Sequence, residues 1–217
     1  MRTMKNVLVA SVIFLAACTV TTGNADTDYK VGELYEHGKG VAQDMSEAVK
    51  YYRKAAKDGS AEAQFTMGVL SYEGNGVKRD LAESVEWFRS AAMQGLAQAQ
   101  YNLGNAYRAG EGAEQDFDLA LEWYHKAAMQ GYAPAAHNIG AMAGNGEGTP
   151  QSYTEAYKWL LLSEKLGTVA DKTYKEKFRS GLSQETQTRI EADVKTMYEQ
   201  IKQNYTSSMP AIPSLVK

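Results

Sequence analysis

The chain has 217 residues, and 23 Lys and Arg residues against 26 Asp and Glu residues give it a formal charge of −3. Basic residues are interspersed with acidic ones, so the sequence lacks the basic patch by which proteins bind nucleic acid. We therefore expect no nucleic-acid partner.

The first 25 residues predict an export signal. Arg2 and Lys5 precede the run Val7–Ala17, in which every residue is apolar or small. This run is too short to span a bilayer as a helix, and a short apolar run behind basic residues is typical of a signal that is removed on export. We assign residues 1–25 to this signal and a short linker.

The end of that run, Leu15-Ala16-Ala17-Cys18, resembles the lipobox of bacterial lipoproteins. The resemblance implies that Cys18, the only cysteine in the chain, is acylated. Thr19 after it implies a place on the periplasmic side of the outer membrane. The alternative is ordinary cleavage after Ala25, which would release a soluble periplasmic or secreted protein.

Between residues 26 and 167 the sequence repeats with a period of 36 residues. Four columns of glycine coincide without a gap when the sequence is shifted by one period. They are Gly32, Gly68, Gly104 and Gly140; Gly38, Gly74, Gly110 and Gly146; Gly40, Gly76, Gly112 and Gly148; and Gly59, Gly95, Gly131 and Gly167. Self-similarity at such a period is typical of stacked helical units, which bury a core between neighbouring repeats.

The unit Leu96–Gly131 shows how one repeat is built. Apolar and small residues at helical spacing predict a first helix that ends near Arg108, and Gly110-Glu111-Gly112 predicts the turn after it. A phosphate-binding loop would need a preceding strand and further residues that are absent. Asp116 predicts the N-cap of a second helix rather than a metal ligand, because a capping residue recurs at this place in every repeat.

Each predicted second helix carries two columns of large residues. They are Tyr51, Trp87, Trp123 and Trp159, followed by Tyr52, Phe88, Tyr124 and Leu160. Large side chains that recur in every repeat predict inter-repeat core rather than a ligand-binding aromatic box. The mid-helix glycine of each first helix predicts close contact between helices, since glycine costs about 1 kcal/mol there relative to alanine.

The pattern Ala-x-Ala-Gln-x-x-x-Gly, Gly-x-Gly-Val, Asp, Trp-Phe or Trp-Tyr, Ala-Ala and Gly resembles the Sel-one-like repeat (SLR), a relative of the tetratricopeptide repeat (TPR). Residues 60–131 match it closely, and residues 132–167 depart from it in several places. The resemblance implies an all-α fold, a right-handed superhelical α/α solenoid of about four 36-residue helix-turn-helix repeats over residues 26–167.

Residues 168–205 predict C-terminal capping helices. Tyr174 and Phe178 lie at helical spacing, and Ile190, Val194 and Ile201 form an apolar stripe further on. A solenoid must cover its open end, so we interpret these helices as a cap, with a partner-binding helix as the alternative. Residues 206–217 contain few residues that could pack and predict a disordered tail.

The sequence shows no catalytic constellation, metal-ligand set or cofactor site. His37, His125 and His137 form no His-x-x-x-His pair, and no Gly-x-Ser-x-Gly motif is present. We therefore predict a protein that is not an enzyme and that binds no metal or cofactor. Carboxylates that converge only in the fold are the open alternative.

The resemblance to TPR proteins implies that the first helices line a concave groove. The candidate groove residues are Lys30, Glu62, Thr66, Tyr72, Gln98, Asn102, Asn105, Arg108, His137 and Asn138. Asparagine amides both donate and accept hydrogen bonds, so they suit a peptide backbone. The alternative is that these residues are simply solvated helix positions.

These observations together predict an exported, membrane-anchored scaffold of the bacterial cell envelope that binds a protein or peptide on the concave face. Two alternatives stay open. One is an envelope hydrolase of the cell-wall or β-lactam type, and the other is a secreted host-interaction factor.

Overall fold

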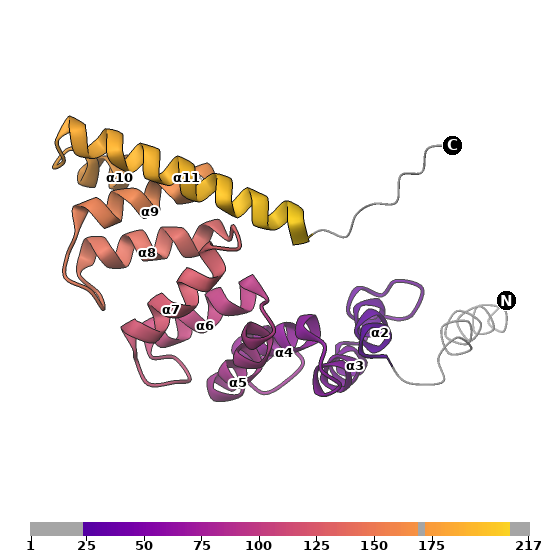
Figure 1. Ribbon diagram of the computed structural model, residues 1–217. Helices are drawn as coiled ribbons and strands as arrows, with labels where there is room; N and C mark the ends of the chain where they lie inside the picture. Colours follow the sequence, from indigo (N-terminus) through magenta and orange to yellow (C-terminus); the bar gives the residue numbers. More distant parts are fainter. Residues whose placement is uncertain (1–23, 169–171, 209–217) are drawn as a thin grey trace, which may run out of the picture. The chain divides into compact units, whose positions relative to one another are not determined.

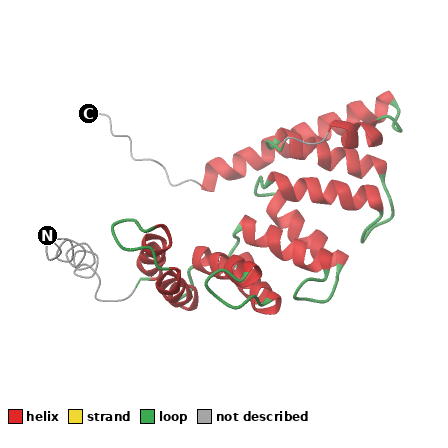
Figure 2. Cartoon of the chain, turned by 180° about the vertical axis from the view of Figure 1, so that it is seen from behind, coloured by secondary structure: helices red, strands yellow, loops and turns green. Residues whose placement is uncertain are grey.

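The computed structural model describes residues 24–168 and 172–208. In these residues the regular structure is helical throughout, without a strand (Figures 1 and 2). The helices are α2 (Ala25–His37), α3 (Met45–Lys57), α4 (Ala61–Glu73), α5 (Leu81–Met93), α6 (Ala97–Ala109), α7 (Phe117–Ala128), α8 (Ala133–Asn145), α9 (Tyr153–Lys165), α10 (Lys172–Arg179) and α11 (Gln184–Ser208). This order confirms the predicted all-α fold of helix-turn-helix repeats.

The chain divides into two compact units. Unit 1 comprises the residues up to Ala99 together with Glu111–Ala113, and unit 2 comprises Gln100–Gly110 and the residues from Glu114 onward. Helices α2, α4, α6 and α8 are the first helices of the repeats, and α3, α5, α7 and α9 are the second helices. In unit 1, α2 packs against α3 and α4 against α5; in unit 2, α8 packs against both α7 and α9.

Mid-helix glycines let the two helices of a repeat approach closely, as predicted. A Cβ atom on Gly32 would lie 2.5 Å from Cε1 of Tyr52, and one on Gly104 would lie 2.7 Å from Cδ1 of Tyr124. Both distances are well below the normal carbon–carbon contact of about 3.5–4.0 Å. Any side chain at these positions would therefore push the helices apart.

Side-chain caps begin the second helices at the predicted residues. The carboxylate Oδ1 of Asp44, Asp80 and Asp116 accepts from a backbone N–H three residues later, at 3.1, 3.0 and 2.9 Å. Ser152 does the same through its hydroxyl oxygen at 3.2 Å. Each cap satisfies a donor that the helix itself leaves free, which fixes where the second helix starts.

The two predicted columns of large residues both pack in the core, but they are buried to different extents, and in the outer column Trp159 is buried at 6% exposure. Tyr52 is only 1% exposed, but Trp87 and Trp123 in the neighbouring column are half-buried. The indole N–H of Trp87 donates to Oε1 of Glu83 at 3.2 Å, and Nζ of Lys126 lies 4.0 Å from the ring centroid of Trp123. These two tryptophans therefore lie at the edge of the core, because each keeps a polar neighbour at the surface.

Helices α10 and α11 pack against α9, in keeping with the predicted cap. Phe178, Ile190, Val194 and Ile201 are buried. A Cβ atom on Gly144 would clash with the ring of Phe178. Gly144 stands one period after Arg108, so the fourth repeat gives up a side chain at this position and the capping helix fills the space.

Several predicted boundaries move by a few residues. Helix α2 begins at Ala25 with Asn24 as its N-cap, and α11 continues to Ser208 instead of ending at residue 205. Cys18, the rest of the export signal and residues 209–217 of the predicted tail lie outside the described residues. Within the described ranges, no helix has both the length and the hydropathy to cross a membrane.

Candidate functional site: a polar cluster beside a hollow in unit 2

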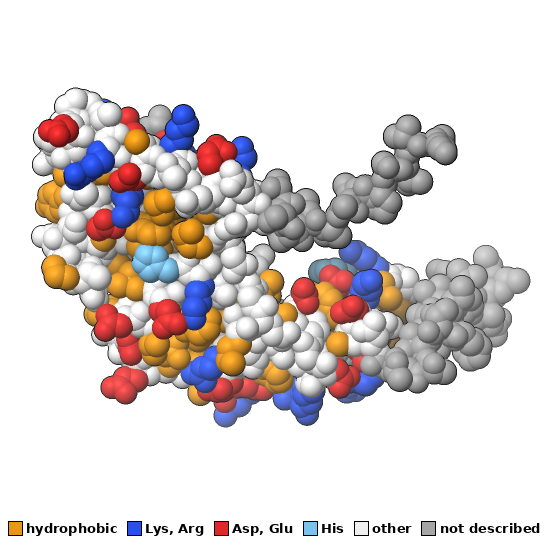
Figure 3. Space-filling view, viewed as in Figure 1, with side chains coloured by type: hydrophobic (Ala, Val, Ile, Leu, Met, Phe, Trp, Pro, Cys, Tyr) orange, Lys and Arg blue, Asp and Glu red, His pale blue; other side chains and the backbone are white. Residues whose placement is uncertain are grey.

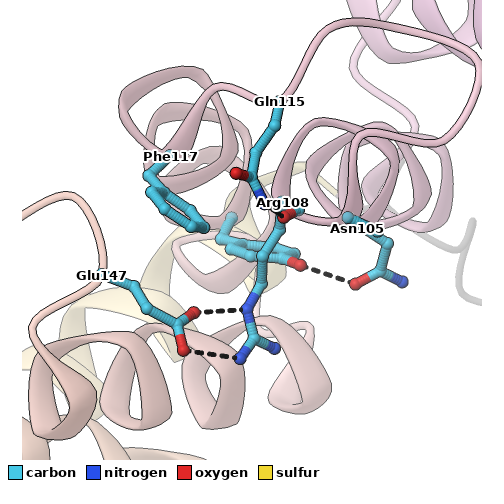
Figure 4. A pocket seen from close by; sticks show the side chains of 7 residues that line it. Asn105, Arg108, Gln115, Phe117 and Glu147 are labelled. Atoms are coloured by element: carbon cyan, nitrogen blue, oxygen red, sulfur yellow. Dashed lines mark hydrogen bonds and ion pairs between the residues drawn. The ribbon is translucent and has the colours of Figure 1, made fainter.

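A hollow of about 480 Å³ opens in unit 2 between the end of α6, the start of α7 and the loop after α8. Figure 4 shows how its side chains lie. The lining residues are Asn105, Arg108, Ala109, Gln115, Phe117, Tyr124 and Glu147. The lining therefore combines amides, one ion pair and two aromatic rings.

Asn105 of α6 is held by two donors. The hydroxyl of Tyr124 donates to its Oδ1 at 2.6 Å, and Nδ2 of Asn138 on α8 donates to the same oxygen at 3.1 Å. Tyr124 is 0% exposed, and burial raises the pKa of its hydroxyl to about 12. The hydroxyl thus keeps its proton at neutral pH, and the two bonds turn the Nδ2 donors of Asn105 toward other partners.

Arg108, one helical turn after Asn105, forms the ion pair of the site. Its Nε and Nη2 donate to Oε2 and Oε1 of Glu147 at 2.8 and 3.3 Å, and Nδ2 of Asn145 donates to Oε1 of Glu147 at 2.9 Å. These bonds to Arg108 and Asn145 lower the pKa of Glu147. Because Glu147 is ionised and paired, it is poorly suited to act as a general acid or base.

Unit 1 contains a related contact at the equivalent repeat positions. The hydroxyl of Tyr72 donates to Oε2 of Glu111 at 3.0 Å. Tyr72 and Glu111 each precede their counterparts Arg108 and Glu147 by 36 residues. In both units, the end of a first helix is therefore linked to the Gly-x-Gly loop of the next repeat.

Sequence reasoning missed Glu111 and Glu147 and treated both only as the middle residue of a turn. The signal was present in the 36-residue period. A polar residue at the end of one first helix recurs together with a glutamate 39 positions later in two successive repeats. Neither sequence spacing along a helix nor a turn motif would reveal such a pair, because its members belong to different repeats.

The predicted groove residues divide between the units. Lys30, Glu62, Thr66, Tyr72 and Gln98 lie in unit 1, whereas Asn102, Asn105, Arg108, His137 and Asn138 lie in unit 2. The unit 2 structure brings Asn105 and Asn138 into direct contact and places Arg108 one turn from Asn105.

His137 belongs to the same region of unit 2. Its ring centroid lies 6.4 Å from that of Tyr174 on α10. Burial, with a smaller contribution from the charge of Arg108, lowers the pKa of His137. Its Nδ1 is buried and has no hydrogen-bond partner among the described residues. The neutral form of this histidine is thus favoured, and its ring neighbours Tyr174 of the capping helix α10.

The surface around this region is mixed in character. In the face shown in Figure 3, acidic and basic side chains are interspersed, and hydrophobic side chains gather over α7, α8 and α9. In the described part of the chain, no group of three or more His, Cys, Asp or Glu residues could hold a metal ion. The polar groups of the hollow are joined to one another by hydrogen bonds and an ion pair.

Comparison with known proteins agrees with the repeat structure. The family model of the Sel1 repeat matches residues 25–60, 61–96, 97–132 and 133–168. A Sel1 repeat protein from Oxalobacter formigenes is similar in structure, with a TM-score of 0.65 and 32% identity over 68% of this chain and 42% of that one. No curated protein matches the chain.

A second similar structure is a protective antigen of uropathogenic Escherichia coli strains that displays an SLR fold. It has a TM-score of 0.61 and 30% identity over 84% of this chain and 47% of that one. The chain thus spans less than half the length of both structures. Four consecutive matches to one repeat model, with the helix pairs, caps and glycine contacts described above, show that the chain belongs to the Sel1 repeat family.

Proposed function

We propose that this chain is an interaction scaffold that holds an extended segment of another protein on the α6 and α8 surface of unit 2. Sel1 repeat proteins are typically protein–protein interaction scaffolds, and the repeat is typically non-catalytic. The observation that carries the proposal is the fixed amide pair of Asn105 and Asn138 beside the hollow.

The amide pair is suited to a peptide backbone. Tyr124 and Asn138 both donate to Oδ1 of Asn105, so the Nδ2 group of Asn105 can donate to a carbonyl oxygen of the segment. Because the pair is already ordered, binding costs less conformational entropy than it would with free side chains. Phe117 gives the hollow an aromatic wall that can receive a side chain of the bound segment.

The test is loss of partner capture when the amides are removed. Asn102→Ala and Asn105→Ala together should weaken binding of an envelope protein captured by the wild-type chain by roughly tenfold or more, since each lost hydrogen bond is worth about 1 kcal/mol. Asn102 is the safer of the two changes, because its side chain accepts no hydrogen bond from Tyr124 or Asn138, whereas that of Asn105 accepts both.

The matched control is Asn75→Ala, which removes an exposed asparagine from the Gly-x-Gly loop of unit 1. It should leave capture unchanged. Thermal unfolding of each variant separates loss of binding from loss of fold. Equal capture by the wild type and the folded double variant would refute the proposed role of this surface.

We further propose that the chain is exported and anchored through acylated Cys18, facing the periplasm from the outer membrane. The apolar run before Cys18 and the position of α2 support this proposal. Cleavage after Ala25 would remove both the first residue of α2 and its cap Asn24, whose side chain accepts from the N–H of Asp26 at 3.1 Å. Loss of such a cap costs about 1 kcal/mol.

Mass spectrometry of the mature N-terminus tests the anchor. An acylated Cys18 terminus and a shift of Cys18→Ser from the membrane to the soluble fraction are the expected results. An unmodified Asp26 terminus would contradict the anchor and favour a released form.

A further inference from the structure

We infer that the unit 1 surface formed by α2 and α4 docks a segment of the partner that carries Lys or Arg side chains. This inference rests on the proposed function, that the chain holds a protein segment, and adds the chemistry that unit 1 selects. The surface is defined by Glu33 and Glu36 on α2 and by Thr66, Val69 and Tyr72 on α4.

The first helices of the two units differ sharply in charge. Helices α2 and α4 of unit 1 contain one Lys or Arg residue, Lys30, together with His37, and six acidic residues, Asp26, Asp28, Glu33, Glu36, Glu62 and Glu73. Helices α6 and α8 contain no acidic residue, and Arg108 is their only Lys or Arg. Opposite potentials favour association and like charges oppose it, so the surface formed by α2 and α4 favours a basic segment.

The side chains of α2 and α4 lie next to each other on this surface. The hydroxyls of Thr66 and Tyr29 are 3.5 Å apart, which brings the two first helices together. In the 36-residue register Glu33 is equivalent to Val69 and Glu36 to Tyr72, so the stacking of the repeats predicts that these side chains face the same surface.

The carboxylates of this surface are available to an external cation. The hydroxyl of Tyr52 donates to Oε2 of Glu36 at 2.5 Å, which holds the carboxylate in place without neutralising its charge. Neither Glu33 nor Glu36 forms an ion pair with a Lys or Arg among the residues that the structure describes. By contrast, Asp28 in the same helix is paired with Lys54, with Oδ2 and Nζ 2.7 Å apart.

An exposed aromatic ring on α4 is the second, independent feature, and the guanidinium of Arg79 lies 5.8 Å from its centroid. Tyr72 is 42% exposed although it is fixed by its hydroxyl bond to Glu111 and by a bond from Nε of Arg79 to its backbone oxygen at 3.0 Å. Tyrosine is enriched in protein interfaces, where a rigid ring binds at low entropic cost.

Carboxylates next to an apolar strip match the two parts of a long basic side chain. The aliphatic stem of Lys or Arg can lie on Val69 and Tyr72 while its charged head reaches Glu33 and Glu36. An acidic segment would bring like charges together, and a purely apolar one would bury the two carboxylates without a partner. The occupant that fits this surface is therefore a segment in which basic and apolar residues occur together.

A positional-scanning library of labelled octapeptides, incubated with the purified full chain, tests the inference. Peptides with Lys or Arg should be retained about tenfold more than the same peptides with Asp or Glu, and the preference should fall as salt is raised from 50 to 500 mM. The variant Glu33→Gln with Glu36→Gln should lose most of this preference. Glutamine keeps an acceptor for the hydroxyl of Tyr52, so the fold is preserved.

The matched control is Glu114→Gln with Asp118→Asn, which removes two exposed acids elsewhere in the chain and should leave the preference intact. Absence of a basic preference in the wild type, or equal loss in the control, would overturn the inference. The Asn102→Ala and Asn105→Ala variant separates the two proposals. Failure of that variant to weaken capture rejects the unit 2 site while the basic preference of unit 1 stands.

Discussion

Units 1 and 2 each have a tyrosine at one repeat position, but its hydroxyl bonds a carboxylate in unit 1 and an amide in unit 2. Tyr52 and its counterpart Tyr124 are both buried, and they lie two repeat periods apart in the sequence. The hydroxyl of Tyr52 donates to the carboxylate of Glu36, and that of Tyr124 donates to the amide oxygen of Asn105. In these two repeats the second helix thus supplies a fixed hydroxyl. The residue on the first helix determines whether its partner is an acid or an amide.

The second and fourth repeats lack this tyrosine hydroxyl. Phe88 and Leu160 occupy this position in the second and fourth repeats, so neither can donate a hydrogen bond. Among the described residues, the hydrogen bond from this position to a side chain of the first helix is therefore confined to the first and third repeats. One lies in each unit, which makes each unit a reference for the other.

The largest loss of stability should come from adding a side chain at the glycine that lets two helices of unit 2 approach closely. Gly104→Val should destabilise the chain by about 3 kcal/mol or more, because its side chain would overlap the ring of Tyr124. Urea unfolding measures the loss. Ala82→Val at an exposed helical position should cost well under 1 kcal/mol, and a similar cost for both variants would contradict the role of close helix contact.

Removing the tyrosine hydroxyl should lower stability more in unit 1 than in unit 2. Tyr52→Phe should cost about 2 kcal/mol, because its hydroxyl bonds a charged group, and Tyr124→Phe about 1 kcal/mol, because its partner is a neutral amide. Burial and the hydrogen bond to Glu36 raise the pKa of Tyr52, so the hydroxyl is protonated in ordinary buffers. Equal losses in thermal unfolding would show that partner charge does not distinguish the two clusters.

The parts of the fold that follow from one repeat were predictable from the sequence. Gly104, Asp116 and Tyr124 recur with their counterparts in a fixed register, and each acts through neighbours within its own helix pair. The site was predictable only in part. Asn105 and Asn138 were found because both belong to first helices, but Glu147 was not, since its contact depends on how one repeat stacks on the next.

Chain ends show a different limit. Gly144 stands where the third repeat has Arg108, and the structure shows that it makes room for Phe178 of α10. Repeat periodicity carries no information on a helix outside the repeats. For the same reason, the end of α11 at Ser208 could not be placed from the period.

Acid should weaken the ion pair of unit 2 by a measurable amount. Hydrogen bonding to Arg108 lowers the pKa of Glu147 below its unfolded value, so the pair stabilises the fold above that unfolded pKa and the contribution is lost as the pH falls through the folded pKa. Both side chains are partly exposed, which limits the effect to about 1 kcal/mol.

The variant Glu147→Gln isolates this contribution. It should be less stable than the wild type at pH 7, and the difference between their urea midpoints should shrink toward zero near pH 3. Glu111→Gln provides the comparison in unit 1, where the partner is the neutral hydroxyl of Tyr72. A difference for Glu147→Gln that persists unchanged at pH 3 would show that the ion pair is not its source.

The smallest effect should come from the charge of a helix cap, once its geometry is kept. Asp116→Ala removes the acceptor for the N–H of Leu119 and should cost about 1 kcal/mol, whereas Asp116→Asn keeps an acceptor and should cost only a few tenths. The remaining cost of the asparagine reflects the lost attraction between a negative charge and the helix N-terminus, so it should decrease with added salt.

Asp80→Asn provides the comparison in unit 1, because Oδ1 of Asp80 likewise accepts from the N–H three residues later. Because this bond is common to both units, the two asparagine variants should behave alike in thermal unfolding, and a clear difference between them would mean that the caps, like the tyrosines, serve different neighbours in the two units.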